Sequence, residues 1–245
     1  MIAVEGGTAL SGNRLLDRLP AADRARLGQG LALERGEMRH VLLEAGASIR
    51  NVYFPVDAVV SSLTTMSDGS GVEIVTIGNE GMVGSPLFLG STVMSDREYA
   101  QVQVPGKLWR MDASIFSNEM AKGGAFQEVV QLYIQALFSQ ITQQVACNSL
   151  HSVNERCSRW LLLTLDRVNA DEFPMTQEFL SQMLGVRRAS VTLAAGALQH
   201  AGIIRYRLGR ITVLDRYGLE ATACECYRVI RDEFNRLLGT APPRP

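Results

Sequence analysis

The sequence has few of the residues from which metal sites and disulfide frameworks are built. Only four cysteines and three histidines occur among 245 residues. Four cysteines are too few to hold a chain of this length together through disulfides, so reduced thiols are expected. No apolar run approaches the roughly 18 to 20 residues that a membrane helix needs, and the first ten residues lack the pattern of a secretory signal. We therefore expect a cytoplasmic protein.

Neither sign of charge dominates the chain, whose formal net charge is −1. With 47% hydrophobic residues and a mean hydropathy of +0.06, the chain has enough apolar surface for a core, and its length favours two domains. The charge is unevenly distributed, because residues 1–145 hold 11 basic and 15 acidic residues, whereas Pro174–Val213 holds five arginines against Glu178 alone. Only this second region is expected to attract phosphate.

The first half of the chain carries the patterns of a β domain. An amphipathic stretch at Asn13–Leu27 predicts small helices. From His40 to Met111 the apolar residues recur with a period of two, interrupted by turn residues such as Ser67–Gly71, and the alternation is clearest at Tyr99–Val104. Several short strands with glycine-rich corners predict a sandwich or roll.

A long helix of about 20 residues is predicted after Gly124. Its apolar stripe recurs at spacings of three and four and consists of Phe126, Val130, Tyr133, Ile134, Leu137, Ile141 and Val145. Such a helix could close the β domain or pair with its twin. Leu132, Ala136 and Phe138 lie off this stripe, so apolar contacts are expected on more than one side, which favours dimerisation.

Two short helices joined by a tight turn are predicted near the C-terminus. Thr176 is placed to cap the first helix, and Gly185 ends it. The second helix buries Val191, Ala194, Ala195 and Leu198 and stops at Ala201-Gly202. This arrangement is a helix-turn-helix, and its second helix would present Arg187, Arg188, Ala189, Thr192 and Leu193 to DNA base edges.

A basic β-hairpin is predicted directly after these helices. Two β-prone runs turn at Leu208-Gly209, with Arg205 and Arg207 on one face and Arg210 on the second strand. A basic hairpin beside a recognition helix acts as a wing that grips phosphate. The alternative is an ordinary helical hairpin whose arginines are solvated surface, and the wing favours the DNA-binding interpretation.

Two stretches of this sequence resemble the Crp/Fnr family of transcription regulators. The stretch Thr176–Val191 resembles that family's DNA-binding signature, and Ile77–Gly84 resembles its β-roll segment, within a similarity that runs from about residue 13 to about residue 238. The resemblance implies an α+β fold with an N-terminal β-roll (jelly-roll) sensor domain at 1–123, a dimerisation helix at 124–147 and a winged helix-turn-helix at 148–245. It also implies a homodimer on a pseudo-palindromic operator, with RNA polymerase as a partner.

The DNA-binding residues combine the pattern and the resemblance. They are Thr176, Gln177, Arg187, Arg188, Ala189, Ser190, Thr192, Leu193, Arg205, Arg207 and Arg210. The resemblance implies that Arg188 contacts a base or phosphate. Ala189 stands where relatives often carry Glu, and Leu193 where they often carry Arg. Neither side chain makes those polar contacts, so the usual family half-site is not expected.

An effector pocket is expected in the β-roll from the same resemblance. Its residues are Gly81, Val83, Gly84, Ser85 and Arg97. Family members that bind cyclic AMP carry a carboxylate for the ribose after the β-roll glycine, whereas Ser85 and Pro86 follow Gly84 here. Arg97 lies farther along than the phosphate-binding arginine of the family and stands beside Glu98, which weakens an anion site. We expect no cofactor and no response to cyclic AMP, and instead another effector or a partner protein.

The pair Cys224 and Cys226 raises the question of a metal site. Their neighbourhood is predicted as one helix, on which residues two apart point to nearly opposite sides. Structural zinc needs four converging ligands, so we expect no metal, with Cys226 in the core. An iron-sulfur centre of the kind some relatives use is also not expected, because no cysteine precedes Cys147.

The remaining function classes are less well supported by the sequence. No nucleophile elbow or phosphate-binding Walker loop is present, so an enzyme is not expected. A small-molecule-binding module with a helical tail for protein contacts is the other alternative. It would require the basic wing to be accidental, and retention on DNA that depends on salt would distinguish the two.

Overall fold

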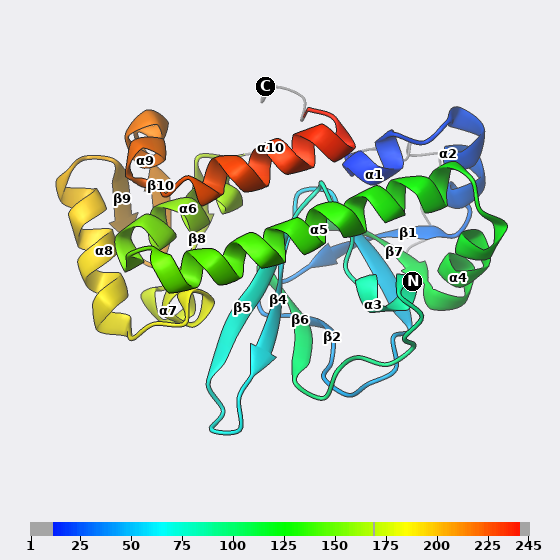
Figure 1. Ribbon diagram of the computed structural model, residues 1–245, viewed down its shortest axis with the longest axis horizontal. Helices are drawn as coiled ribbons and strands as arrows, with labels where there is room; N and C mark the ends of the chain where they lie inside the picture. The colour runs from blue at the N-terminus through cyan, green and yellow to red at the C-terminus, as the bar shows by residue number, and fades with distance from the viewer. Residues whose placement is uncertain (1–11, 169, 241–245) are drawn as a thin grey trace.

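The computed structural model describes residues 12–168 and 170–240, which form a β domain, a long helix and a helical C-terminal domain (Figure 1). The outermost residues of the predicted domains 1–123 and 148–245 lie outside this range. Two short helices begin the described chain, α1 (Arg14–Asp17) and α2 (Ala21–Gly28), as predicted. No helix in the described part of the chain is long and apolar enough to span a membrane.

The N-terminal domain is built from two antiparallel sheets. Their strands are β1 (Leu31–Gly36), β2 (Val41–Leu43), β3 (Asn51–Pro55), β4 (Val59–Thr65), β5 (Gly71–Ile77), β6 (Glu98–Val104) and β7 (Gly106–Asp112). One sheet has the order β1-β7-β3 and the other β2-β6-β4-β5. Ala100, Val102 and Val104 are buried, as the alternation along β6 predicted, and the predicted β-roll is confirmed.

Two short helices accompany the sheets, one between β5 and β6 in sequence and one between β7 and the long helix. These are α3 (Ser85–Phe88) and α4 (Ala113–Lys122), and the long helix α5 spans Ala125–Leu150. The first turn of α5 is anchored in the β domain, because the ring of Phe126 lies 6.2 Å from that of Phe54 and 5.9 Å from that of Phe116. With 26 residues, α5 is longer than predicted and crosses the width of the molecule (Figure 1).

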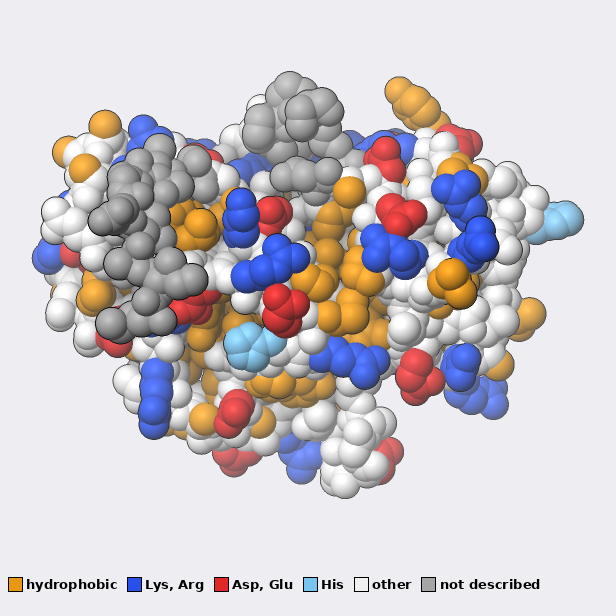
Figure 2. All heavy atoms as spheres, turned by 180° about the vertical axis from the view of Figure 1, so that it is seen from behind, with side chains coloured by type: hydrophobic (Ala, Val, Ile, Leu, Met, Phe, Trp, Pro, Cys, Tyr) orange, Lys and Arg blue, Asp and Glu red, His pale blue; other side chains and the backbone are white. Residues whose placement is uncertain are grey.

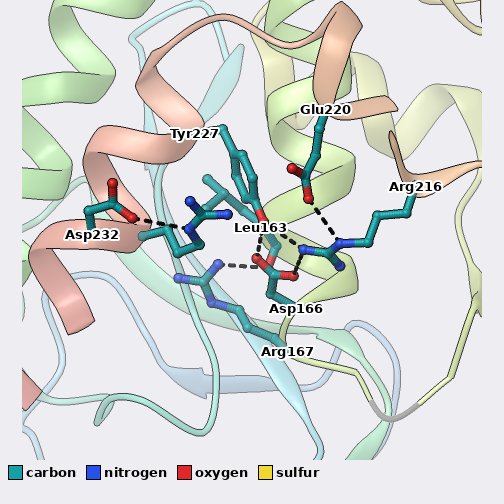
Figure 3. Close-up of polar contacts among 8 residues, drawn as sticks. Leu163, Asp166, Arg167, Arg216, Glu220, Tyr227 and Asp232 are labelled. Carbon is teal, nitrogen blue, oxygen red and sulfur yellow. Dashed lines mark hydrogen bonds and ion pairs between the residues drawn. The ribbon is translucent and has the colours of Figure 1, made fainter. Parts of the chain in front are cut away.

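The C-terminal domain has the predicted helix-turn-helix and hairpin at its centre. Its elements are α6 (Val153–Leu165), β8 (Glu172–Pro174), α7 (Gln177–Leu184), α8 (Arg188–His200), β9 (Ile204–Arg207), β10 (Arg210–Val213), α9 (Arg216–Thr222) and α10 (Cys226–Leu238). Besides the two predicted strands of the hairpin, β8 adds a third strand, giving the order β8-β10-β9. Asp166, Arg216 and Tyr227 hydrogen-bond to one another and join α6, α9 and α10 (Figure 3).

The prediction of one continuous helix across Cys224 and Cys226 is wrong. Helix α9 ends at Thr222, and α10 begins only at Cys226. Ala223, at the end of α9, has an extended backbone, with φ −82° and ψ 152°. The two cysteines are therefore not on opposite sides of a helix, and both side chains are buried.

Helix α10 runs back along α5 toward the β domain (Figure 1). The ring of Phe234 on α10 lies 6.5 Å from that of Tyr133 on α5. At the far end, Arg14 of α1 donates to the backbone oxygen of Gly239. The C-terminal segment therefore contacts both the long helix and the first helix of the chain.

A buried polar interface joins the two domains. Trp160 on α6 donates its indole N–H to Oε1 of Glu73 on β5 at 2.8 Å. Arg167, just after α6, donates from Nε to Oε1 of Glu80 at 2.8 Å, and both side chains are less than a tenth exposed. Because buried charges are tolerated only when paired, this ion pair fixes how the C-terminal domain sits on the β-roll.

Candidate DNA-binding surface

The first helix of the helix-turn-helix begins and ends as its sequence predicted. The Thr176 hydroxyl accepts a hydrogen bond from the backbone N–H of Phe179 at 3.1 Å, which caps α7. Gly185 follows α7 with φ 62°, a left-handed conformation that favours glycine. A side chain at Gly185 would also press on Val72 of the β domain. The tight turn that leads into α8 therefore depends on this glycine.

The second helix buries one face and exposes the other. Its buried face consists of the predicted Val191, Ala194, Ala195 and Leu198. Arg187, Arg188 and Ala189 are exposed at its N-terminal end, and Ser190 is half-buried. Arg187 precedes α8 without capping it through its side chain. This N-terminal end is the part of a recognition helix that reaches base edges.

Two further predicted DNA-binding residues bridge the pair of helices. Thr192 on α8 and Gln177 on α7 hydrogen-bond at 3.0 Å between Oγ1 and Oε1. Leu193 is 75% exposed, which is unusual for a large apolar side chain and leaves it free to touch a ligand. The outward face of α8 is therefore partly apolar, where relatives are expected to be polar.

The predicted wing is present as the β9–β10 hairpin. Its turn residues Leu208 and Gly209 have φ of 51° and 71°, as a two-residue hairpin turn with two positive φ values requires. Arg205 and Arg207 are exposed and face Thr212 and Arg210 in the register. Figure 2 shows several basic side chains at the right-hand end of the molecule, which is the end that carries the helix-turn-helix.

Arg210 differs from the other two wing arginines. It forms an ion pair with Glu172 of β8, which also accepts a hydrogen bond from Thr212 at 2.9 Å. The hydrogen bond from Arg210 is the main reason that the pKa of Glu172 lies below its ordinary value. The sequence analysis missed this partner because it predicted only the two strands of the hairpin and not β8. Arg210 is therefore less available to phosphate than Arg205 or Arg207.

The predicted dimer stripe on α5 is divided between two environments. Phe126, Val130, Tyr133 and Leu137 are buried within this chain. Tyr133 donates its hydroxyl to the backbone oxygen of Met82 at 2.9 Å. These four residues therefore face the chain's own core and not a partner, which corrects the predicted seam. The other three predicted residues are exposed or half-buried: Ile134, Ile141 and Val145.

The exposed apolar side of α5 includes a residue that was left off the predicted stripe. Phe138 is 71% exposed and Val145 is 64% exposed. With Ile134 and Ile141 they form a row that we call the α5 outer stripe, defined as Ile134, Phe138, Ile141 and Val145. Its spacings of four, three and four are those of a two-helix seam. The periodicity of the sequence does not show which of the two apolar sides of α5 is left exposed for a partner.

The predicted effector residues do not share one environment. Gly81, Val83 and Gly84 are buried, Ser85 is half-buried and Arg97 is exposed. A side chain at Gly81 would collide with the Tyr133 ring, and Gly84, with φ 105°, lies against Val52. The close approach of α5 and β3 thus accounts for both glycines without a ligand.

Comparison with known proteins adds a family match in the C-terminal domain. Residues 155–222 match the family described as the Crp-like helix-turn-helix domain. The chain therefore carries a Crp-like helix-turn-helix domain. This confirms the resemblance found in the sequence, and Crp/Fnr proteins are transcription regulators and not enzymes. No curated protein matches the chain in sequence.

Solved structures show the same fold over most of the chain. A transcriptional regulator of the Crp/Fnr family from Eubacterium rectale is 16% identical, with a TM-score of 0.64 over 85% of this chain and 96% of its own. FixK2 from Bradyrhizobium japonicum is 16% identical, with a TM-score of 0.66 over 79% and 98%. The c-di-GMP-responsive regulator CLP from Xanthomonas campestris is 14% identical, with a TM-score of 0.61 over 79% and 99%. The Crp-like domain therefore sits in a Crp/Fnr fold.

Proposed function

We propose that this protein is a sequence-specific DNA-binding transcription regulator that binds a pseudo-palindromic operator as a homodimer. The observation that carries the proposal is the exposed N-terminal end of α8, with Arg187 and Arg188, in a domain whose wing also exposes Arg205 and Arg207. In a Crp-like helix-turn-helix domain, we expect the arginines at the start of α8 to read bases and those of the wing to bind phosphate. In this proposal the protein acts in the cytoplasm, with RNA polymerase as its partner.

The α5 outer stripe supports a second copy of this chain as the dimer partner. Phe138 and Val145 are large apolar side chains that lie exposed on a helix of about 39 Å. Parallel pairing of two α5 helices along this stripe would bury them and put both helix-turn-helix domains at the same end of the dimer. Two recognition helices related by a two-fold axis would then enter successive major grooves, about 34 Å apart.

The composition of α8 favours a half-site that differs from that of typical relatives. Ala189 and Leu193 are exposed and apolar, so neither accepts from cytosine nor donates to guanine. An apolar side chain in the major groove contacts the methyl group of thymine. We therefore expect thymine at the positions that Ala189 and Leu193 reach, and a guanine contact from Arg188.

The effector in this proposal is not cyclic AMP. Arg97 is exposed before β6 and adjoins Glu98, whereas the glycines of the expected pocket are packed against β3 and α5. A cyclic phosphate would lack a buried bidentate clamp at this place. The c-di-GMP-responsive regulator CLP has a related fold, so this architecture is compatible with other effectors. Calorimetry should detect no micromolar binding of cyclic AMP, and binding abolished by Arg97→Ala would contradict the proposal.

The direct test of base reading uses Arg188. We expect Arg188→Ala to weaken binding to a duplex selected from a random library by about 1 to 3 kcal/mol and to relax preference at one base pair. Fluorescence anisotropy with single-base-pair variants of that duplex measures both effects. Arg35→Ala, which removes an exposed arginine of β1, is the matched control and should leave binding unchanged. Equal weakening on every duplex would show that Arg188 contacts only phosphate.

A further inference from the structure

Three of the four cysteines lie together beside a histidine, away from the DNA-binding surface. They are Cys147 on the last turn of α5, Cys224 before α10 and Cys226 at its first residue, and the histidine is His151, which directly follows α5. One atom from each, three sulfurs and a ring nitrogen, all lie within 4.8 Å of one another. We propose that Cys147, His151, Cys224 and Cys226 bind one Zn²⁺ ion.

The separations of these atoms fit a single tetrahedral ion. The sulfurs of Cys147 and Cys224 are 3.5 Å apart, and the sulfur of Cys226 is 3.4 Å from Nδ1 of His151. Ligands about 2.3 Å from a tetrahedral zinc ion lie about 3.8 Å from one another. Three thiolates and one imidazole form one of the ligand sets of structural zinc, with no position left open for a substrate.

Packing alone does not account for the three sulfurs. Cys147, Cys224 and Cys226 form a small buried cluster of their own, separate from the main hydrophobic core. The fourth cysteine, Cys157, is equally buried but lies within the main hydrophobic core. Cys157 thus behaves as an apolar core residue, and the other three cysteines are gathered around one another.

Neighbouring polar side chains hold the proposed zinc ligands in position. His151 directs Nδ1 at Cys226, while its Nε2 lies 3.2 Å from the carboxylate of Glu225. A carboxylate on the far nitrogen holds a histidine in the tautomer that presents its other nitrogen to a metal. Gln143 donates its amide N–H to the sulfur of Cys226 at 3.1 Å. Such a donor stabilises a thiolate.

A buried arginine supplies the charge that such a site needs. Zinc with three thiolates and a neutral imidazole carries one net negative charge. Arg159 on α6 is 1% exposed and acts electrostatically on Cys147, while Arg156 acts on Cys147 and Cys224. Within the described residues, Nε and Nη2 of Arg159 have no hydrogen-bond partner, and only Nη1 is bonded, to Gln144. A negatively charged zinc centre would supply a counter-charge to this buried cation.

Two alternatives to zinc, a disulfide and an iron-sulfur cluster, fit the geometry of these cysteines less well. A disulfide between Cys147 and Cys224 requires a sulfur separation near 2.05 Å. It also does not explain why the side chains of Cys226 and His151 lie at the same place. An iron-sulfur cluster holds its ligands on several iron atoms around bridging sulfides, which needs a wider cage than four atoms within 4.8 Å. The experiments below distinguish the disulfide and the iron-sulfur cluster from zinc.

The ion would join two parts of the molecule at a corner of the chain. Cys147 lies on the last turn of α5 and His151 directly follows it, and α6 begins two residues after His151, at Val153. Cys224 and Cys226 belong to the C-terminal segment that leads from the wing into α10. Zinc at this point would fasten the helix-turn-helix domain to the long helix and would stabilise the fold, because the binding energy of a structural ion is folding energy.

The proposal is tested by the metal content of the full-length, tag-free protein purified without chelators. Elemental analysis should find about one zinc ion per chain. Cys224→Ser and Cys226→Ser should lose the ion, whereas Cys157→Ser, which removes the buried cysteine outside the cluster, should retain it. The metal measurement does not depend on DNA binding, so it fails or succeeds independently of the proposed function.

A second measurement, on the unaltered chain, tests for the zinc site even if the cysteine variants do not fold. Cobalt(II) added to chelator-treated protein should give the thiolate charge-transfer bands and the intense visible bands of tetrahedral coordination. The proposal is overturned if these bands are absent and no zinc is found. It is equally overturned by a Cys147–Cys224 disulfide in mass spectra, by iron with acid-labile sulfide, or by zinc loss in Cys157→Ser as well.

Discussion

The arginines of the wing differ in how available they are for contacts with DNA phosphates. Arg205 and Arg207 are exposed, whereas Arg210 is engaged by Glu172. Each arginine that neutralises a phosphate releases a counterion and steepens the salt dependence of binding by about one. The three arginines are alike in sequence, and only the strand β8 distinguishes them.

We predict that Arg207→Ala flattens the slope of log affinity against log salt concentration by about one, equally on specific and unrelated duplexes. Arg210→Ala should change the slope less, because its guanidinium is already paired with a carboxylate. Anisotropy titrations at several salt concentrations measure both. If Arg210→Ala flattens the slope as much as Arg207→Ala, the ion pair with Glu172 does not persist on DNA.

Glu73 is a buried carboxyl group, and its burial outweighs the opposing effect of the hydrogen bonds from Ser61, Thr76 and Trp160 on its pKa. Burial raises the pKa of Glu73 above its ordinary value of 4.5. Its Oε2 lies 2.6 Å from the Ser61 hydroxyl, which also lies 2.8 Å from Oε1 of Gln103. The Ser61 hydroxyl has one hydrogen, so a protonated Glu73 can donate to Ser61 while Ser61 donates to Gln103. Gln103 in turn donates to Thr164 at 3.0 Å.

The raised pKa sets the sign of a pH effect on stability. The folded chain holds the proton more tightly than the unfolded chain, so the free energy of unfolding falls as the pH rises from about 4.5 through the folded pKa. Glu73→Gln mimics the protonated form and should flatten this dependence, with stability at about pH 8 equal to or above that of the unaltered protein. Urea denaturation across this pH range measures it. A steeper fall in the variant would show that Glu73 is ionised in the fold.

At the level of elements, the proposed dimer depends on the α5 outer stripe. We predict that Phe138→Glu with Val145→Glu yields a monomer, because a charge in the seam of a parallel pair faces its own copy. Glutamate is a good helix former, so α5 itself should persist. Sedimentation velocity measures the change in mass. Tyr217→Glu, which alters an exposed aromatic residue of α9, should remain dimeric, and a dimeric α5 variant would contradict the proposed seam.

The sequence predicted elements whose ends carry local signals. Thr176 caps α7, Gly185 ends it, and Leu208-Gly209 turns the wing, each through backbone geometry that a few neighbouring residues determine. The split between α9 and α10 escaped prediction because its apolar pattern continues across Cys224. The gathering of that residue with Cys147 depends on the return of α10 along α5, which no local pattern encodes.

The seam on α5 illustrates the same limit. The sequence of α5 is apolar on two sides. Its periodicity identifies both sides but does not show which one the β-roll covers. Tyr133 turned out to face the β-roll, and Phe138 to face outward. Contacts between distant segments, such as that of Trp160 with Glu73, could not be predicted from the sequence either, because neither residue has a local signal for the other.

At the scale of the whole molecule, the ion pair of Glu80 and Arg167 holds the domains together. Arg167 also donates from Nη1 to the backbone oxygen of Leu163 at 2.7 Å (Figure 3), so the guanidinium is held at both ends. A side chain at Gly78 would collide with Arg167, which shows how closely the β-roll packs on it. Removing one partner of such a pair leaves an uncompensated buried charge.

We predict that Arg167→Ala lowers the free energy of unfolding by about 3 to 5 kcal/mol. Arg167→Met combined with Glu80→Gln should recover part of that loss, because no charge is left buried alone. Arg35→Ala, which removes an exposed ion pair with Glu37, should cost less than about 1 kcal/mol. Urea denaturation at one protein concentration compares them. Equal stability of Arg167→Ala and Arg35→Ala would mean that the domains do not rely on this pair.

The central claim is that two copies of this chain read DNA through α8 with two-fold symmetry. Selection of binding sequences from a random duplex library with the purified full-length protein, followed by sequencing, tests it most directly. We predict an inverted repeat whose half-sites are centred about 10 base pairs, or one helical turn, apart, with thymine at the apolar contacts. A single motif without an inverted partner, or no enrichment at all, would contradict the account.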